Sequence, residues 1–158
     1  MFGGALEFLD EEREDWRPFE ALAALPDERL ERPVEAAHGW SGRELMAHLT
    51  AWQEVALAIA RELAVGESSP TLEQAEADWD SRGGEVINAE ILETWAALPI
   101  DEVRRRFLTV PGELRGYLTV VPETRWVKHP RHMDALLWDT LYHYADHRAD
   151  LEAILATA

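Results

Sequence analysis

Cysteine is absent from this chain of 158 residues, and its absence excludes several kinds of chemistry. No disulfide framework, no thiolate metal ligand and no cysteine nucleophile can be built from it. Any thiol that takes part in a reaction here would have to be supplied by another molecule.

Basic residues are scarce as well. Lys and Arg together number 15, against 31 Asp and Glu, which gives a formal net charge of −16 at pH 7. A field of that sign repels the phosphate backbone of nucleic acids and the surface of anionic membranes. The charge therefore predicts that neither nucleic acid nor a membrane is a partner.

Long hydrophobic runs are also missing. The longest apolar run, Val55–Ala60, is far shorter than the roughly 20 residues that cross a bilayer. The segment Met1–Asp10 lacks the basic start and apolar stretch of a secretory signal. These features predict a cytoplasmic protein.

What the chain does contain is the composition of an ordinary globular domain. Hydrophobic residues make up 47% and charged residues 29% of it, and no repeat or linker divides it. A single domain over residues 1–158 is the expectation from this length.

Helical periodicity dominates the pattern of apolar residues, and strand-like alternation is rare. Two short helices are expected between the second and third long ones, at Thr71–Trp79 and Glu85–Leu98. The long helices are expected over Leu6–Leu25, between Ser41 and Gly66, from Asp101 up to a loop at Thr119–Pro130, and over Arg131–Ala156. The predicted fold is therefore all-α, a four-helix bundle with a long crossover between helices 2 and 3.

Local signals support these boundaries. Ser41 is a good N-cap, and Glu44 three residues later completes a capping box. Asp101 is predicted to cap the third long helix in the same way. Pro111 lies inside the apolar pattern of that helix and is predicted to kink or split it.

Three of the six histidines are candidate metal ligands. His143 and His147 are four residues apart and share one face of the last helix, while His48 lies on the shoulder of the apolar face of the second. Facing helices of a bundle can bring such side chains together. Three neutral imidazoles suit Zn²⁺, Ni²⁺ or another borderline divalent ion, and hydrogen-bonded core histidines are the alternative.

The other three histidines, His38, His129 and His132, lie in predicted connectors. They are expected to be solvated loop residues. Loss of His38 or His129 is therefore not expected to affect metal binding.

Several stretches together resemble the DinB-like superfamily. The second helix carries a Trp-Ser start and a histidine followed by leucine, and the last helix carries a His-x-x-x-His pair followed by an acidic and an apolar residue. The stretches are Gly39-Trp40-Ser41-x-Arg43-Glu44-Leu45-x-Ala47-His48-Leu49-x-Ala51-Trp52, Asn88-Ala89, Leu98-Pro99-x-Asp101-Glu102-Val103 and His143-Tyr144-x-Asp146-His147-x-x-Asp150-Leu151.

The resemblance implies a DinB-like four-helix bundle in which His48, His143 and His147 bind one divalent metal ion. Zn or Ni would suit these ligands best, and Mn or Fe would also be compatible. Related branches include transferases that use bacillithiol, mycothiol or glutathione, so the resemblance implies a metal-dependent thiol S-transferase, or a related hydrolase, acting on small electrophiles. An external low-molecular-weight thiol would be the cosubstrate.

Other functions stay open at this point. One is a non-catalytic, stress-related bundle that binds metal, and another is a protein that sequesters or modifies a toxic small molecule for self-resistance. No catalytic residue can be assigned. Such bundles often dimerise through an exposed apolar face, so a homodimer and a monomer both stay open.

Five further residues are candidates around the metal. Asp139 and Asp150 are placed to hold the second nitrogen of an imidazole, and solvated surface carboxylates are the alternative. Trp52 and Tyr144 are expected to line a substrate pocket, with an ordinary aromatic core as the alternative. Trp126, in the loop before the last helix, is a candidate lid.

Overall fold

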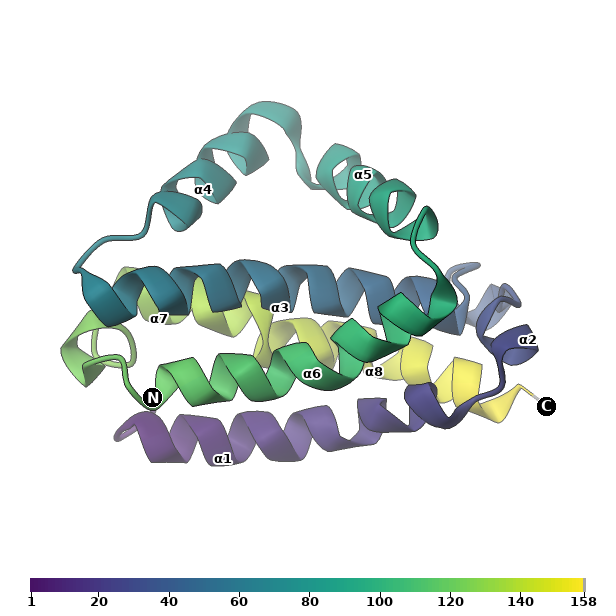
Figure 1. Cartoon of the computed structure of the whole chain (residues 1–158), viewed down its shortest axis with the longest axis horizontal. Helices are drawn as coiled ribbons and strands as arrows, with labels where there is room; N and C mark the ends of the chain where they lie inside the picture. The colour runs from purple at the N-terminus through teal and green to yellow at the C-terminus, as the bar shows by residue number, and fades with distance from the viewer. Residues whose placement is uncertain (158) are drawn as a thin grey trace.

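Four helical rods lie side by side along the long axis of the computed structural model, which describes residues 1–157 (Figure 1). No strand occurs in these residues, so the predicted all-α bundle is confirmed. The rods are α1 (Ala5–Trp16) continued by the 3₁₀-helix η1 (Arg17–Ala24), α3 (Gly42–Val65), α6 (Ile100–Leu118), and α7 (Pro130–Asp139) followed by α8 (Leu141–Ala156).

The connections between the rods contain shorter elements. Helix α2 (Asp27–Leu30) and the 3₁₀-helix η2 (Glu35–Ala37) lie between the first and second rods. The 3₁₀-helix η3 (Glu123–Arg125) interrupts the loop expected at Thr119–Pro130. Over the part of the chain that the structure covers, no helix is both long enough and apolar enough to cross a membrane.

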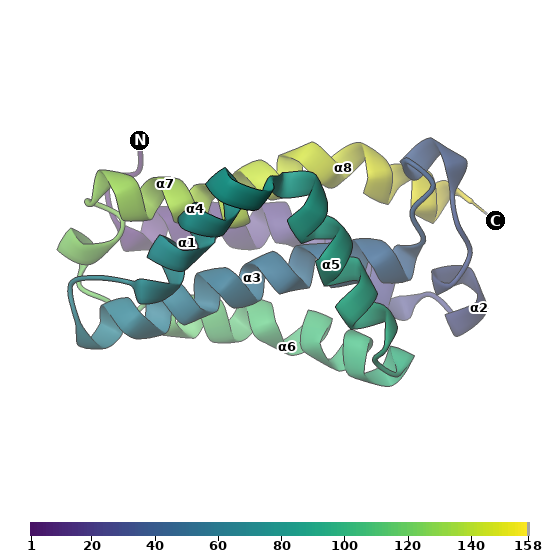
Figure 2. The ribbon, with the colours of Figure 1, turned by 90° about the horizontal axis from the view of Figure 1, so that it is seen from above.

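The crossover forms an arch above α3, and Figure 2 shows it from above. Helices α4 (Pro70–Arg82) and α5 (Gly84–Ala96) make its two sides, close to the two short helices that the sequence predicts. Gly83 turns the corner between them with a φ of 84°, in the left-handed region that glycine adopts without strain. A Cβ on Gly84 would come within 2.5 Å of the Trp79 ring, so this position leaves the space that the indole occupies.

Side chains of α3 fasten both ends of the arch. At the first end, the Glu62 carboxylate accepts hydrogen bonds from the Ser69 hydroxyl (2.6 Å) and from the backbone N–H and the hydroxyl of Thr71 (3.1 Å each). At the second end, the Arg43 guanidinium donates to the carbonyl oxygen of Ala96, the last residue of α5, and to that of Leu98 just after the helix. The arch is therefore held over α3 by groups that belong to α3 itself.

The predicted capping box at the start of α3 is present. The Glu44 backbone N–H donates to the Ser41 hydroxyl oxygen at 3.1 Å, and the Glu44 carboxylate lies within reach of the Ser41 backbone N–H. This cap determines where α3 begins and, with it, the helical phase at which His48 lies.

The centre of the bundle contains an aromatic cluster crossed by a buried polar network. Trp16 packs on Phe19, Phe107 and Tyr144, with ring centroids 5.0–5.4 Å away. The Tyr144 hydroxyl donates to the buried Glu12 carboxylate at 2.7 Å, and Arg115 pairs with the same carboxylate. The network supplies the buried charge with partners, which a desolvated carboxylate requires.

Two expectations about the ends of the rods are wrong. The first helix does not run from Leu6 to Leu25 as one α-helix, because it changes to 3₁₀ geometry after Trp16. Pro18 has no N–H to continue the α-helical hydrogen bonds at this point. The third long helix begins at Ile100 behind Pro99, and no Asp101 side-chain cap is formed.

The last helix is not continuous from Arg131 to Ala156, as the sequence predicts, but breaks at Thr140. The Thr140 backbone has φ −128° and ψ −101°, and its hydroxyl donates to the Leu136 carbonyl at 2.6 Å. A threonine hydroxyl bonded to the preceding turn competes with regular helical hydrogen bonding. His143 and His147 both lie after the break, so their shared face on α8 is preserved.

Pro111 does not split its helix. Helix α6 runs unbroken from Ile100 to Leu118, with Pro111 among its buried residues. A proline removes one backbone donor and displaces one carbonyl, and a long helix packed along α3 tolerates that loss.

Candidate metal centre and its cavity

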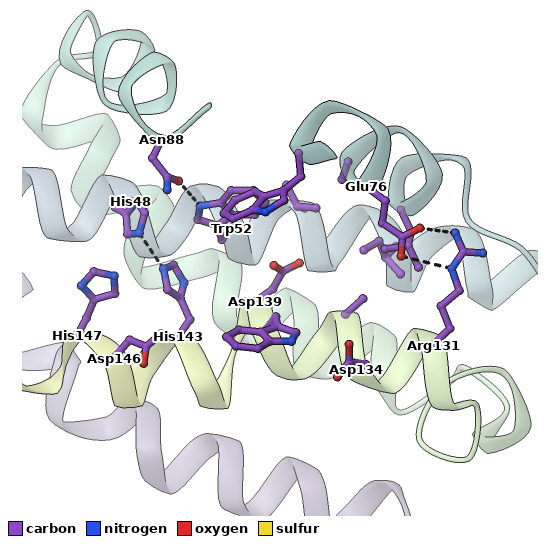
Figure 3. A pocket seen from close by; sticks show the side chains of 17 residues that line it. His48, Trp52, Glu76, Asn88, Arg131, Asp134, Asp139, His143, Asp146 and His147 are labelled. Atoms are coloured by element: carbon purple, nitrogen blue, oxygen red, sulfur yellow. Dashed lines mark hydrogen bonds and ion pairs between the residues drawn. The ribbon is translucent and has the colours of Figure 1, made fainter. Parts of the chain in front are cut away.

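Three histidines from two helices converge between α3 and α8. His48, His143 and His147, here called the triad, each offer one ring nitrogen, and these nitrogens all lie within 4.8 Å of one another. The Nε2 atoms of His48 and His143 are 2.8 Å apart (Figure 3). This is the juxtaposition that the helical spacing predicts.

The Asp150 carboxylate binds His147 on the side of the ring that faces away from the other two histidines. Its Oδ2 accepts a hydrogen bond from Nδ1 of His147 at 2.9 Å, which leaves Nε2 of that ring with its lone pair toward the triad. Its Oδ1 lies 2.8 Å from Nδ1 of His38. One buried carboxylate therefore joins a triad histidine to the connector before α3.

His38 is the residue that makes this second contact possible. Its backbone has a φ of 57°, an uncommon value for a residue with a side chain, and its imidazole is 81% exposed. The sequence predicts a solvated loop histidine at this position, and the exposure agrees, but its contact with Asp150 was not anticipated.

Trp40 covers the triad from the same connector. Its indole stacks on His147 with centroids 5.4 Å apart and planes 18° apart, and it meets His48 edge-on at 4.8 Å. Because Trp40 precedes the Ser41 cap, the beginning of α3 and the cover over the triad are set by neighbouring residues. Sequence reasoning missed this role, although Trp40 belongs to the stretch that resembles the DinB-like superfamily.

Burial keeps two of the imidazoles neutral. Burial, together with the neighbouring triad histidines, lowers the pKa of His48 to about 3 and that of His143 to about 2. The Nδ1 atoms of both rings are buried and have no hydrogen-bond partner in residues 1–157. The site therefore presents neutral imidazoles, the form that binds a metal ion.

These pKa shifts predict that the metal-free protein loses stability in mild acid. Unfolding returns each imidazole to a pKa near 6.5, so the unfolded chain binds protons that the folded chain excludes between pH 6.5 and about 3. The free energy of unfolding should fall as pH drops, by about 1.4 kcal/mol per pH unit for each histidine. Urea unfolding at a series of pH values measures this slope.

The control for that slope is His48→Gln, which cannot be protonated. Its slope should be smaller than the parent's by about 1.4 kcal/mol per pH unit between pH 6.5 and about 3, while titrating groups that do not contact His48 contribute equally to both proteins. Equal slopes would contradict the assignment of the acid sensitivity to His48.

The triad lies at one end of a cavity of about 640 Å³ beneath the arch. Figure 3 shows the histidines at one end and the ion pair between Glu76 and Arg131 at the other. Residues of α3, α4, α5, α7 and α8 line it: His48, Trp52, Val55, Ile59, Leu72, Ala75, Glu76, Trp79, Asn88, Arg131, Asp134, Ala135, Trp138, Asp139, His143, Asp146 and His147. A volume of this size accommodates a small organic molecule beside the triad.

The predicted pocket residue Trp52 lies on the cavity wall. Its indole N–H donates to the Asn88 side-chain oxygen at 2.9 Å, which joins α3 to α5. Its ring meets Trp79 of α4 edge-on, with centroids 5.8 Å apart. Trp79 and Trp138 had no sequence signal, since only the folded arch and α7 bring them to this cavity.

The two other aromatic candidates lie elsewhere. Tyr144 is buried in the aromatic cluster around Trp16 and is not among the lining residues. Trp126 is fully buried, packs edge-on against Phe8 and donates its indole N–H to the Val121 carbonyl. Its expected place as a lid is wrong, because the loop folds its ring into the core at the end of the bundle.

Asp139 lies on the cavity wall between the triad and the Glu76–Arg131 ion pair (Figure 3). No hydrogen bond joins it to an imidazole within residues 1–157, because the break at Thr140 separates it from the helix that carries His143. Burial raises the pKa of its carboxyl well above the usual range.

Comparison with known proteins assigns the chain to a family. Residues 9–152 match the family model described as the mycothiol maleylpyruvate isomerase N-terminal domain. The chain belongs to that family. No curated protein and no solved structure matches the chain.

Membership in the mycothiol maleylpyruvate isomerase N-terminal domain family agrees with the resemblance in the sequence, since this family is a DinB-like superfamily domain. The matched range contains the triad, Trp40, Asp150 and every residue that lines the cavity. The candidate site therefore lies wholly within the part of the chain that defines the family.

Proposed function

We propose that the chain is a metal-dependent thiol S-transferase, or a related hydrolase, that acts on small electrophiles. The observation that carries this proposal is the convergence of the triad at the end of a cavity large enough for a small molecule. The family description names mycothiol, which supports a low-molecular-weight thiol as cosubstrate. Because the chain has no cysteine, no thiol of its own competes for the metal.

The residues present fit one divalent ion. The rings of His48 and His143 are neutral, their Nε2 atoms face each other 2.8 Å apart, and Asp150 fixes the tautomer of His147, as carboxylates do for metal-binding imidazoles. Three nitrogen ligands from a protein suit Zn²⁺ or Ni²⁺ and leave a position for another group. A bound divalent ion supplies positive charge that lowers the pKa of an adjacent thiol.

The chain's own residues have separate tasks in this reaction. Asp150 and Trp40 keep His147 in one orientation, and the cavity wall at Trp52 holds the electrophile within reach of the thiol. The thiol sulfur forms a bond to the electrophilic carbon, the leaving group departs with its electron pair, and the thiol proton passes to water. Enclosure beneath the arch supplies proximity, which converts a slow encounter into a local reaction.

The test combines metal content with thiol consumption. Protein purified without a histidine tag is analysed for its elements, loaded with Zn²⁺ or Ni²⁺, and mixed with an aromatic electrophile and mycothiol, bacillithiol or glutathione in turn. We expect about one metal ion per chain and conversion of one thiol well above the uncatalysed rate. His143→Ala should abolish both, whereas His129→Ala, outside the cavity, should retain both.

Two other functions give different results in the same experiment. Stoichiometric metal without consumption of any thiol would replace the transferase with a non-catalytic metal-binding bundle. Tight binding of the electrophile by protein that lacks metal would favour sequestration, which the aromatic wall around Trp52 and Trp79 also supports.

A further inference from the structure

The charged side chains on the cavity wall are mostly acidic. Glu76, Asp134, Asp139 and Asp146 line it, and the one guanidinium among its lining residues is that of Arg131. Two nitrogens of that guanidinium face the Glu76 carboxylate. Nε lies 3.3 Å from one carboxylate oxygen, and Nη2 lies close to the other. Arg131 is therefore already engaged by a carboxylate and does not offer a free charge to an anionic ligand.

Indole rings line the same cavity. Trp52, Trp79 and Trp138 come from three different helices, and the last two are about half exposed. The face of an indole ring carries negative electrostatic potential and attracts cations. Aromatic walls and carboxylates therefore favour the same sign of charge in a ligand.

Asp139 adds a deeper carboxyl in the middle of this wall (Figure 3). It has no ion-pair or hydrogen-bond partner among residues 1–157, and burial disfavours its ionised form. A positive group placed beside it would offset the cost of that ionisation. Nothing on the opposite wall, formed by α3 and the arch, supplies such a group.

We infer that the molecule held by this cavity next to the triad is an organic cation with a flat apolar body, such as an arylalkylamine that also carries an electrophilic carbon, and not a carboxylate. This inference rests on the proposed function, because it names the class of electrophile that the thiol would attack. A metal ion at the triad and a thiolate beside it would alter the charge at one end only. The other end, which contains Asp134 and the Glu76–Arg131 ion pair, keeps a net negative charge.

The test uses three ligands that share one phenylethyl body. Phenethylamine is cationic at neutral pH, phenethyl alcohol is neutral and hydrocinnamate is anionic. Calorimetric titration of the parent protein should give a dissociation constant for the amine at least about tenfold below that for hydrocinnamate, with the alcohol in between. Added salt should weaken the amine's binding.

Two substitutions examine the cavity wall directly. Asp139→Asn and Trp79→Leu should each weaken the binding of phenethylamine several-fold. Each should also reduce the gap, meaning the ratio between the dissociation constants of hydrocinnamate and phenethylamine. Asp80→Asn removes the same charge from an exposed position of α4 outside the lining, and should leave the gap unchanged. Equal binding of amine and hydrocinnamate by the parent, or an equal effect of Asp80→Asn and Asp139→Asn, would overturn the inference.

The same titrations separate this inference from the proposed function. His48→Ala lacks a triad ligand but retains the acidic, indole-lined wall, so its preference for phenethylamine should persist. A preference for phenethylamine without any thiol transfer would contradict the proposed transferase function and support the inferred selectivity of the cavity. Thiol transfer by a protein that binds hydrocinnamate as tightly as phenethylamine would support the transferase function and contradict the inferred selectivity.

Discussion

Replacing any one triad histidine with alanine should weaken the binding of Zn²⁺ by about a hundredfold or more, since even the loss of a hydrogen-bonded group behind a ligand costs about 10–100-fold. The three nitrogens lie within 4.8 Å of one another, so each substitution removes one of the three proposed ligands from the centre. Calorimetric titration of His48→Ala, His143→Ala and His147→Ala measures the loss.

Asp150→Asn should have a graded effect, about 10–100-fold, because the amide can no longer hold His147 as strongly as a carboxylate does. His132→Ala is the matched control. The expectation that His132 is a solvated loop residue is wrong, because the residue is buried in α7 outside the cavity lining and its imidazole bonds the Arg125 carbonyl. Parent-like affinity in all three triad variants would eliminate the metal centre, and an equal loss in His132→Ala would assign the effect to folding.

The second large effect is expected in the aromatic cluster of the core. Trp16→Ala should lower the free energy of unfolding by about 3–5 kcal/mol, the usual range for removing a buried tryptophan. The ring is 2% exposed and contacts Phe19, Phe107 and Tyr144, which come from three different rods. The cavity left behind cannot close without moving those helices. Urea unfolding followed by circular dichroism measures the difference.

Trp138→Ala provides the comparison for Trp16→Ala. Its indole is 57% exposed on α7, so its loss should cost less than about 1 kcal/mol. If the two variants unfolded at the same urea concentration, Trp16 would not be the anchor that joins the rods.

Much of the bundle can be predicted from local pattern. The Ser41–Glu44 capping box and the spacing of apolar residues place α3, and the break at Gly83 and Gly84 separates the two helices of the arch. These features depend on neighbours within a few residues, so they are visible in the sequence. The errors at Pro18 and Thr140 share a cause, because both concern how one residue alters the hydrogen bonds of an otherwise periodic segment.

The break at Thr140 also changes the position of Asp139. On an unbroken helix Asp139 would lie one turn before His143 and beneath its ring. The break at Thr140 moves it onto the cavity wall instead, where burial controls its pKa. A change in helix geometry at one residue therefore altered the chemistry expected of another.

The helices and the two faces that carry the histidines follow from local pattern, because the four-residue spacing of His143 and His147 and the phase of His48 after its cap are properties of single helices. The surroundings of these histidines depend on how the helices pack. The cover by Trp40, the sharing of Asp150 between His38 and His147, the cavity beneath the arch and the burial of Trp126 all join residues distant in the chain. Such contacts depend on how the rods and the arch pack together, and periodicity within one segment carries no information about that.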